Sequence, residues 1–250
     1  MTSLGITVED RLGVRHVVLD RPDKKNALTV AMYAVLADAI ASAAADDIGA
    51  LLIAARGDTF TAGNDLRDFL EQPPHGDDAP VSRFLTGLVT TDVPIVAAVR
   101  GAAVGVGTTM LLHCDVVFAS PTARFKVPFV DLGLVPEAGS SVLLARRIGR
   151  ARAGAALYLG ETIGADQAFA DGLVTKLVAD DVLDADAEAA ARAIAAKPRQ
   201  AVRETKRLVT HDREEILAAM AREGVAFQAR LASEEARAAM SAFFTRGARG

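Results

Sequence analysis

The stretch "PIVAAVRGAAVGVGTTMLLHCDVVFAS", residues 94–120, decides how the chain folds. An apolar strand leads into a turn that contains Gly101, Gly105 and Gly107, and a helix and a second apolar strand follow. A helix that opens directly after a buried strand presents unpaired backbone N–H groups and the positive end of its dipole. The N–H of Val106 is therefore placed to stabilise an oxyanion. A purely structural interpretation, in which the glycines allow close helix–strand packing, stays open on this stretch alone.

Strands and helices alternate on both sides of this stretch, which predicts an α/β fold. Two strands meet around Leu12 and Gly13, a helix follows with Thr29 as its N-cap, and residues 48–56 form a buried strand. The strands "DVVFAS", "ARFKVP" and "GLVTKLV" are expected further along. Residues 213–247 are helical and amphipathic, as is typical of oligomer contacts. We expect a core over residues 1–195 and a C-terminal helical region over 196–250.

The composition narrows the classes of function. A net charge of −4 and a pI of about 5.6 give no basic face for nucleic acid. The apolar runs are far shorter than the roughly 20 residues of a membrane helix, and the N-terminus does not read as a secretory signal. Cys114 is the single cysteine, so no intrachain disulfide is possible. We expect a soluble cytoplasmic protein that binds neither nucleic acid nor membrane.

A second glycine turn lies in "FTAGNDL", residues 60–66. Gly63 permits backbone angles that other residues avoid, and small neighbours leave the backbone N–H groups unshielded. The N–H of Asn64 would then point beyond the end of the preceding strand. An ordinary strand-to-helix turn explains the same residues, so the motif alone does not decide between a turn and an anion site.

An acidic residue stands out in "DLGLVPEAGSS", residues 131–141, because the flanking segments look buried. A helix is predicted to begin at Ser140, and an acid near a helix N-terminus is favoured by about 0.3–1 kcal/mol through the dipole. Glu137 can therefore be a capping acid. It can also be a general base beside two oxyanion donors, where it would abstract a proton α to a carbonyl.

Other candidates for chemistry are weaker. The four histidines have no metal-ligand spacing, and "AGSS" is not a nucleophile elbow. His113 and Cys114 are expected to fill the core. The polar segment Gln72–Pro80 is predicted as a loop that shapes a binding pocket.

Taken together and in order, these stretches resemble the enoyl-CoA hydratase/isomerase (crotonase) superfamily. The resemblance runs from "VVLDRPDKKNALT", residues 17–29, through the motifs above to the tail "EEARAAMSAFFTR". It implies a right-handed spiral of β-β-α turns with a helical C-terminal trimerisation region. It also implies an acyl-CoA thioester as substrate, no cofactor other than the coenzyme A of that substrate, and a homotrimer or homohexamer.

The resemblance assigns roles to individual positions. The oxyanion hole falls on the backbone N–H groups of Asn64 and Val106, in agreement with the two glycine turns. The remaining substrate-binding positions share contact with coenzyme A or with the acyl group. These positions are Lys24, Lys25, Ala62, Asp65, Leu66, Thr109, Phe129 and Phe243, the last from a neighbouring subunit.

Departures from the family pattern narrow the choice among the reactions of the family. Hydratases of the family carry two water-activating glutamates, and this chain has Thr109 and Phe129 at those positions. Peroxisomal-type Δ3,Δ2-enoyl-CoA isomerases carry a glutamate at the position of Glu137. The resemblance therefore implies isomerisation of a 3-enoyl-CoA by one base, with a pKa raised by Phe129, Val130 and Leu134. A hydratase-like lyase or hydrolase on an unusual acyl-CoA and a non-catalytic acyl-CoA-binding oligomer remain alternatives.

Overall fold

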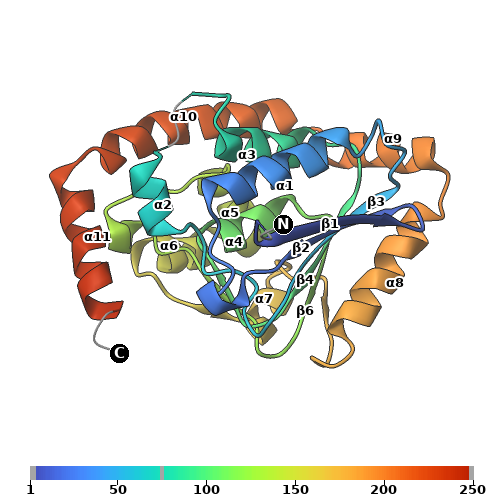
Figure 1. Cartoon of the computed structure of the whole chain (residues 1–250), viewed down its shortest axis with the longest axis horizontal. Coiled ribbons are helices and arrows are strands. Elements are labelled where there is room, and N and C mark those ends of the chain that lie inside the picture. Colours follow the sequence, from blue (N-terminus) through green and yellow to red (C-terminus); the bar gives the residue numbers. More distant parts are fainter. Residues whose placement is uncertain (1–3, 74–75, 248–250) are drawn as a thin grey trace.

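The centre of the molecule is a six-stranded sheet, seen in a computed structural model that describes residues 4–73 and 76–247 (Figure 1). Its order is β1-β2-β3-β4-β6-β9, and all neighbours run parallel except the antiparallel pair β1 and β2. Parallel strands need crossovers, which the helices supply. The strands are β1 (Ile6–Arg11), β2 (Val14–Leu19), β3 (Ala50–Ala55), β4 (Ile95–Val99), β6 (Val116–Ala119) and β9 (Lys176–Leu177).

A second sheet of three strands takes its strands in the same order along the chain as the main sheet. Its order is β5 (Ala102–Val104), β7 (Arg124–Lys126) and β8 (Ile163–Gly164). β5 follows β4 and β7 follows β6, while Thr61, soon after β3, forms a bridge with Ala103 of β5. Each of these turns therefore places one segment in each sheet before a helix follows. The result is a stack of β-β-α turns.

Helices cover both faces of the main sheet. α1 (Val30–Ser42) and α3 (Pro80–Thr90) lie over one face, and α8 (Leu183–Ala195) lies over the other (Figure 1). β3 is buried on both faces, as is typical of a central parallel strand. Its alternate side chains enter two apolar clusters: Leu51 and Ile53 pack in the cluster of α1 and α3, and Ala50 and Leu52 pack in that of α8.

The C-terminal helices lie along the edge of the molecule. α10 (Arg213–Leu231) packs on α3 and α5 (Ser140–Ile148), and α11 (Glu234–Gly247) packs on α10 and the 3-10 helix η3 (Val130–Leu132). The division at residue 195 stays a prediction. The remaining helices are α2 (Leu66–Glu71), α4 (Val106–Thr109), α6 (Arg150–Tyr158), α7 (Ala165–Ala170), α9 (Arg199–Val209), η1 (Pro22–Lys24) and η2 (Met110–His113).

Two local signals of the sequence are confirmed. Thr29 caps α1, because its hydroxyl accepts a hydrogen bond from Met32 N at 3.3 Å. α5 begins at Ser140, as expected. Of the predicted loop Gln72–Pro80, residues 74 and 75 lie outside the described residues, and Pro80 already belongs to α3.

Three expectations need correction. Residues 213–247 form two helices rather than one: the first ends at Leu231, and Ser233 caps the second by accepting from Ala236 N at 3.2 Å. The helix after Gly105 makes only one α-helical turn before it tightens into η2. The strands β5 and β8, of three and two residues, were not expected.

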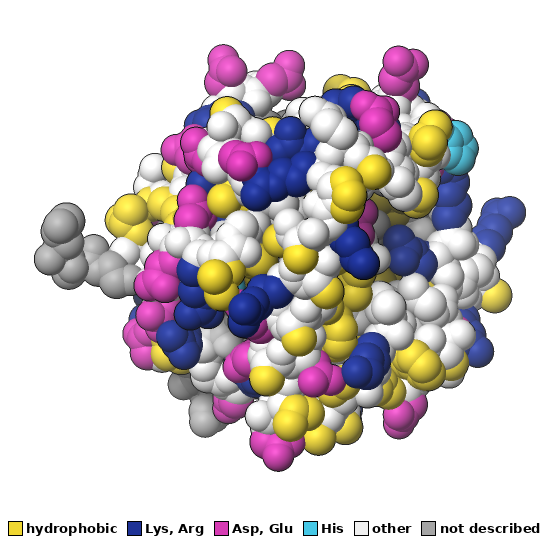
Figure 2. Space-filling view, turned by 90° about the vertical axis from the view of Figure 1, so that its right-hand side faces the viewer, with side chains coloured by type: hydrophobic (Ala, Val, Ile, Leu, Met, Phe, Trp, Pro, Cys, Tyr) yellow, Lys and Arg dark blue, Asp and Glu magenta, His cyan; other side chains and the backbone are white. Residues whose placement is uncertain are grey.

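The surface at the α8 and α9 end carries both signs of charge. Lys and Arg side chains alternate there with Asp and Glu (Figure 2). None of the helices in the described part of the chain is long and apolar enough to cross a membrane.

Candidate active site

The two glycine turns lie side by side. Thr61 N donates to Ala102 O at 3.0 Å, and Val104 N donates to Thr61 O at 3.0 Å. Gly63 has φ of +88°, and a Cβ at this position would lie 2.8 Å from Val104 O. Only glycine fits both the backbone angle and the space. The turn that ends at Asn64 is therefore held against the turn that opens α4.

Asn64 is fixed from two directions. Leu28 N donates to Gly63 O and Asp65 N donates to Leu28 O, both at 2.8 Å, so the peptide on each side of Asn64 is paired. The Asn64 side chain accepts a hydrogen bond from Tyr33 Oη at 2.5 Å. Burial raises the pKa of Tyr33 well above its ordinary value, so the phenol keeps the proton that it donates. The hydrogen bonds that fix Asn64 leave its own N–H unused.

Val106 opens α4, and Gly105 precedes it with φ of +56°. The Gly105 carbonyl accepts from Thr108 N and Thr109 N at 2.9 and 3.0 Å, which closes the first helical turn. Within residues 4–73 and 76–247, no hydrogen-bond acceptor is found for the N–H of Asn64 or of Val106. The first N–H groups of a helix have no intrahelical partner, so this is the expected state of Val106.

Glu137 is joined to α4 through a side chain. Thr109 Oγ1 donates to Glu137 Oε1 at 2.5 Å, and Thr109 is fully buried. The hydroxyl of Thr109 thus holds the carboxylate of Glu137. The helix that supplies Val106 therefore also orients Glu137.

Burial raises the pKa of Glu137 from 4.5 to about 7, against the hydrogen bond from Thr109, which lowers it. The nearby negative charge of Glu223 raises it further. The direction agrees with the prediction. Phe129 and Leu134 are buried in the main apolar cluster, whereas Val130 is 50% exposed at the start of η3, so the part that each of them plays in this burial stays a prediction.

The N-terminus of α5 is capped by Glu223 of α10. Gly139 N donates to Glu223 Oε2 at 2.7 Å, and Ser141 N donates to Glu223 Oε1 at 2.9 Å. The capping interpretation of Glu137 is therefore wrong, because another carboxylate holds that place. Sequence reasoning missed Glu223, although a signal exists: it shares an i, i+4 stripe with the buried residues Ala219 and Phe227.

The turn between Glu137 and α5 has an unusual backbone. Ala138 and Gly139 have φ of +59° and +70°, and the first is costly for a residue with a side chain. His113 Nε2 lies 2.8 Å from Ala138 O, and burial lowers the pKa of His113 to about 4. The neutral ring therefore donates its Nε2–H to that carbonyl. Cys114 is buried as predicted, but His113 has a specific role in holding the turn.

Asn64 and Glu137 line one cavity of about 730 Å³. Its walls come mainly from α3 and α10, with apolar side chains such as Leu85, Met220 and Phe227. A cavity of this size and character suits a small organic ligand. The tertiary structure thus places the candidate base and one candidate oxyanion donor on the same cavity.

The predicted coenzyme A residues fall into two groups. Ala62 N donates to Lys25 O at 2.9 Å, so the turn with the exposed Lys24 and Lys25 adjoins the turn of Asn64. Asp65 accepts from Arg21 Nη1 at 2.8 Å, and although burial acts to raise the pKa of Asp65, this bond together with backbone hydrogen bonds lowers it. Leu66 begins α2 beside them. Phe243 is distant in sequence and half exposed on α11, so its role stays a prediction.

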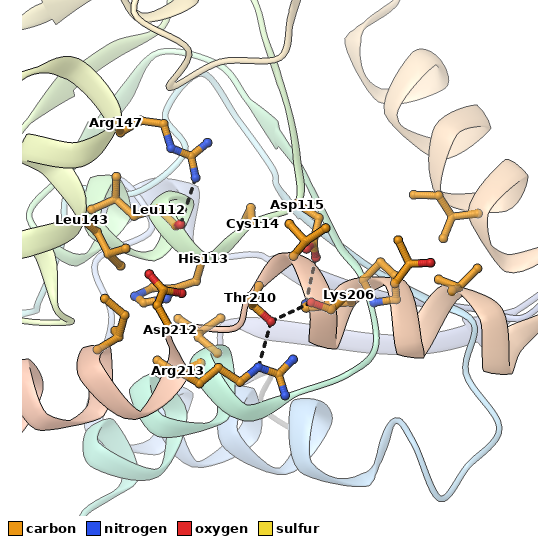
Figure 3. Close-up of a pocket in the computed structure, with 18 of the residues that line it drawn as sticks. Leu112, His113, Cys114, Asp115, Leu143, Arg147, Lys206, Thr210, Asp212 and Arg213 are labelled. Atoms are coloured by element: carbon orange, nitrogen blue, oxygen red, sulfur yellow. Dashed lines mark hydrogen bonds and ion pairs between the residues drawn. The ribbon is translucent and has the colours of Figure 1, made fainter.

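A larger cavity of about 1080 Å³ lies between η2, α5, α9 and α10 (Figure 3). Two of its cations are paired with carboxylates of the core: Lys206 Nζ lies 2.8 Å from Asp115 Oδ2, and Arg213 Nη1 lies 2.7 Å from Asp92 Oδ1. These contacts fasten α9 and α10 to the core. His113 belongs to this wall and reaches from it to the Glu137 turn. No group of three His, Cys, Asp or Glu in the described chain could hold a metal ion.

Comparison with known proteins gives consistent matches. The enoyl-CoA hydratase/isomerase family model matches residues 9–248. A crystal structure of enoyl-CoA hydratase/isomerase from Pseudoalteromonas atlantica T6c superposes with a TM-score of 0.93 and 44% identity, and the match covers 97% of each chain.

The names of the relatives refer to two activities. Enoyl-CoA delta isomerase 2 of Rattus norvegicus is 32% identical over 251 residues, which are 98% of this chain but only 64% of that protein. The probable enoyl-CoA hydratase echA8 of Mycobacterium bovis (strain ATCC BAA-935 / AF2122/97) is 33% identical over 256 residues, 99% of this chain and 98% of that one. Since the identities are nearly equal, the reaction has to be argued from the site.

Proposed function

The chain belongs to the enoyl-CoA hydratase/isomerase (crotonase) family and has its fold, a spiral of β-β-α turns, and on that premise we propose that it isomerises a 3-enoyl-CoA to the conjugated 2-enoyl-CoA. The observation that carries the proposal is Glu137. Its carboxyl lines a cavity shared with Asn64 and has a pKa of about 7. A general acid–base group is most effective when its pKa lies near the working pH.

The thioester oxygen would bind between the N–H groups of Asn64 and Val106. Both turns are held by backbone hydrogen bonds, so the donors need no rearrangement when negative charge develops on that oxygen. One such donor is worth about 2.7–4 kcal/mol in comparable systems. The role of these two N–H groups is to stabilise the enolate.

Glu137 would move a single proton. Its ionised carboxylate removes a proton from C2, and the C–H electron pair delocalises into a dienolate whose charge rests on the thioester oxygen. The same carboxyl returns the proton to C4, which leaves the double bond between C2 and C3. Atoms and charge balance without a second base. The hydrogen bond from Thr109 would hold Glu137 in line with both carbons.

Hydration is less well supported because it needs a second group to activate water. Phe129 is buried and apolar, and the Thr109 hydroxyl is occupied by Glu137. Glu223 lines the same cavity, but each of its oxygens accepts a backbone N–H of the α5 terminus. Of Glu137 and Glu223, Glu137 is therefore the carboxyl for which the contacts favour proton transfer.

The remaining features of the proposal concern binding and assembly. Coenzyme A enters with the substrate, and no further cofactor is needed. We assign the protein to the cytoplasm as a homotrimer or homohexamer. The coenzyme A part would contact Lys24, Lys25, Ala62, Asp65 and Leu66, with Phe243 supplied by a neighbouring subunit.

The test is an assay of 3-enoyl-CoA isomerisation and 2-enoyl-CoA hydration. Glu137→Gln should lower the kcat of isomerisation about 10²- to 10⁴-fold, because proton transfer loses its base. Glu9→Gln removes an exposed glutamate of β1 and is the matched control that should leave kcat unchanged. Undiminished isomerisation by Glu137→Gln, or hydration faster than isomerisation by the wild type, would refute the assignment. Binding of acyl-CoA without any product would instead favour the non-catalytic alternative.

A further inference from the structure

We propose that Glu223 of α10 is a positioning residue for the base: it occupies the N-terminus of α5, leaves the Glu137 carboxylate free for proton transfer and sets the pH at which Glu137 works. The inference rests on the proposed function of Glu137. It concerns a residue that touches no reacting atom and acts through its hydrogen bonds and its charge.

The geometry of Glu223 is that of a two-point clamp. Its two carboxylate oxygens lie 2.7 and 2.9 Å from Gly139 N and Ser141 N, so both ends of the carboxylate are bound. Glu223 is 6% exposed, and carboxylates are rarely buried this deeply without partners. The clamp comes from a helix 84 residues away in the chain. It ties α10 to the first turn of α5.

This clamp determines what the neighbouring carboxylate can do. A helix N-terminus attracts negative charge through its free N–H groups and its dipole. Glu137 lies three residues before the first residue of α5, and its own carbonyl already accepts from Ser140 N at 3.0 Å. Without Glu223, the carboxylate nearest to those N–H groups along the chain would be that of Glu137. With Glu223 in place, Glu137 turns instead to Thr109.

The same clamp acts on the ionisation of Glu137. It binds the positive end of α5, and it adds a negative charge close to a partly buried carboxyl, which raises the pKa of Glu137 in addition to the larger effect of desolvation. A base with a pKa near neutrality takes a proton from carbon more readily than one near 4.5 and still ionises at working pH. Glu223 would therefore strengthen Glu137 as a base.

The groups that face Glu137 do not offset this charge. Tyr33 of α1 keeps its proton, Thr109 of α4 is neutral, and His113 of η2 is neutral above pH 4 and bonds the Ala138 carbonyl. Asp77 lines the same cavity and adds a further acid. No lysine or arginine belongs to the described lining of this cavity. The charge of Glu223 consequently acts on Glu137 without a compensating cation.

The test compares the titration of Glu137 in wild type and in Glu223→Gln, using the ¹³C resonances of labelled glutamate carboxyls. Glu137→Gln identifies the resonance of Glu137. In Glu223→Gln we expect the pKa of Glu137 to fall by about half a unit to one unit. The acid limb of the kcat/KM profile for isomerisation should move to lower pH by the same amount, and the plateau of kcat should fall because the base is weaker.

A matched control separates this effect from general loss of charge. Glu214→Gln makes the same change at an exposed position of α10 and should move neither the titration nor the acid limb. A Glu223→Gln variant that is less stable but keeps the wild-type pKa of Glu137 would overturn the proposal, since Glu223 would then only cap a helix.

Glu223→Asp is the alternative if the glutamine variant does not fold. It retains the charge and weakens the clamp, so kcat should fall while the pKa of Glu137 stays within about 0.3 units of wild type. If the pKa of Glu137 in Glu223→Asp falls as far as is expected for Glu223→Gln, the proposal is also overturned. If the wild type has no isomerase activity, the proposed function fails, whereas the titration of Glu137 still decides the role of Glu223.

Discussion

Burial gives Glu137 a pKa of about 7 in the folded chain, whereas an ordinary glutamate ionises near 4.5. Below pH 4.5 both states are protonated, so this group has no effect on stability there. As the pH rises from 4.5 to 7, the unfolded chain releases a proton that the folded chain keeps, and the folded state becomes less favourable. The group therefore costs stability above pH 7, with an upper limit of about 3 kcal/mol.

A stability measurement checks this sign. Glu137→Gln should have a higher Tm than the wild type at pH 8, and the two should unfold at similar temperatures at pH 4. Thr109 can still donate to the glutamine oxygen, so the hydrogen bond survives the change. Glu9→Gln should show no such dependence on pH. A wild type that is more stable than Glu137→Gln at pH 8 would contradict the raised pKa.

Tyr33 is a second residue whose role only the structure reveals. Tyr33→Phe removes the hydrogen bond to Asn64 Oδ1 and leaves that oxygen unpaired, which should cost about 1–3 kcal/mol of unfolding free energy. The turn that presents the Asn64 N–H should loosen, so kcat should fall about tenfold while KM changes little. Steady-state kinetics and urea unfolding test both effects. An unchanged kcat would show that Tyr33 only fills the core beside Phe84.

At the scale of structural elements, the two glycine turns act as one unit. Gly63→Ala would force a side chain to φ of +88° and bring its Cβ within 2.8 Å of Val104 O. We expect a loss of about 1–3 kcal/mol of unfolding free energy and a fall in kcat, because both oxyanion turns shift. Gly164→Ala is the control, since a Cβ there would meet no atom within 4 Å. Equal effects of the two substitutions would argue against a coupled pair of turns.

The longer elements were predictable, and the short ones were not. The six apolar residues of β3 and the capped helix after Thr29 carry their own pattern. β5 and β8 have three and two residues, too few for any periodicity, and they exist because the adjacent strand β7 pairs with both. The sequence around Ser233 has a continuous helical pattern. The helix breaks there because the Ser233 hydroxyl caps the next helix.

At the scale of the whole molecule, the prediction concerns assembly. The helical tail exposes apolar side chains, among them Leu208 at 76% and Val225 at 75%, as a protein that associates with copies of itself would. Light scattering after size-exclusion chromatography should give three or six times the 26.1 kDa of one chain. A mass of one chain at micromolar concentration would contradict the trimer and hexamer.

The sequence by itself determined the α/β pattern and the two glycine turns, because each depends on residues close together in the chain. The order of the motifs, with Thr109 and Phe129 at two positions of the family pattern, then favoured Glu137 as the candidate base. The tertiary structure decided how those parts act on one another. Thr109 reaches Glu137 across 28 residues, and Glu223 reaches the α5 terminus across more than 80. Such contacts follow from the way α4 and α10 pack on the core, which no local pattern specifies. The same packing partly buries Glu137, and the desolvation of its carboxyl raises its pKa.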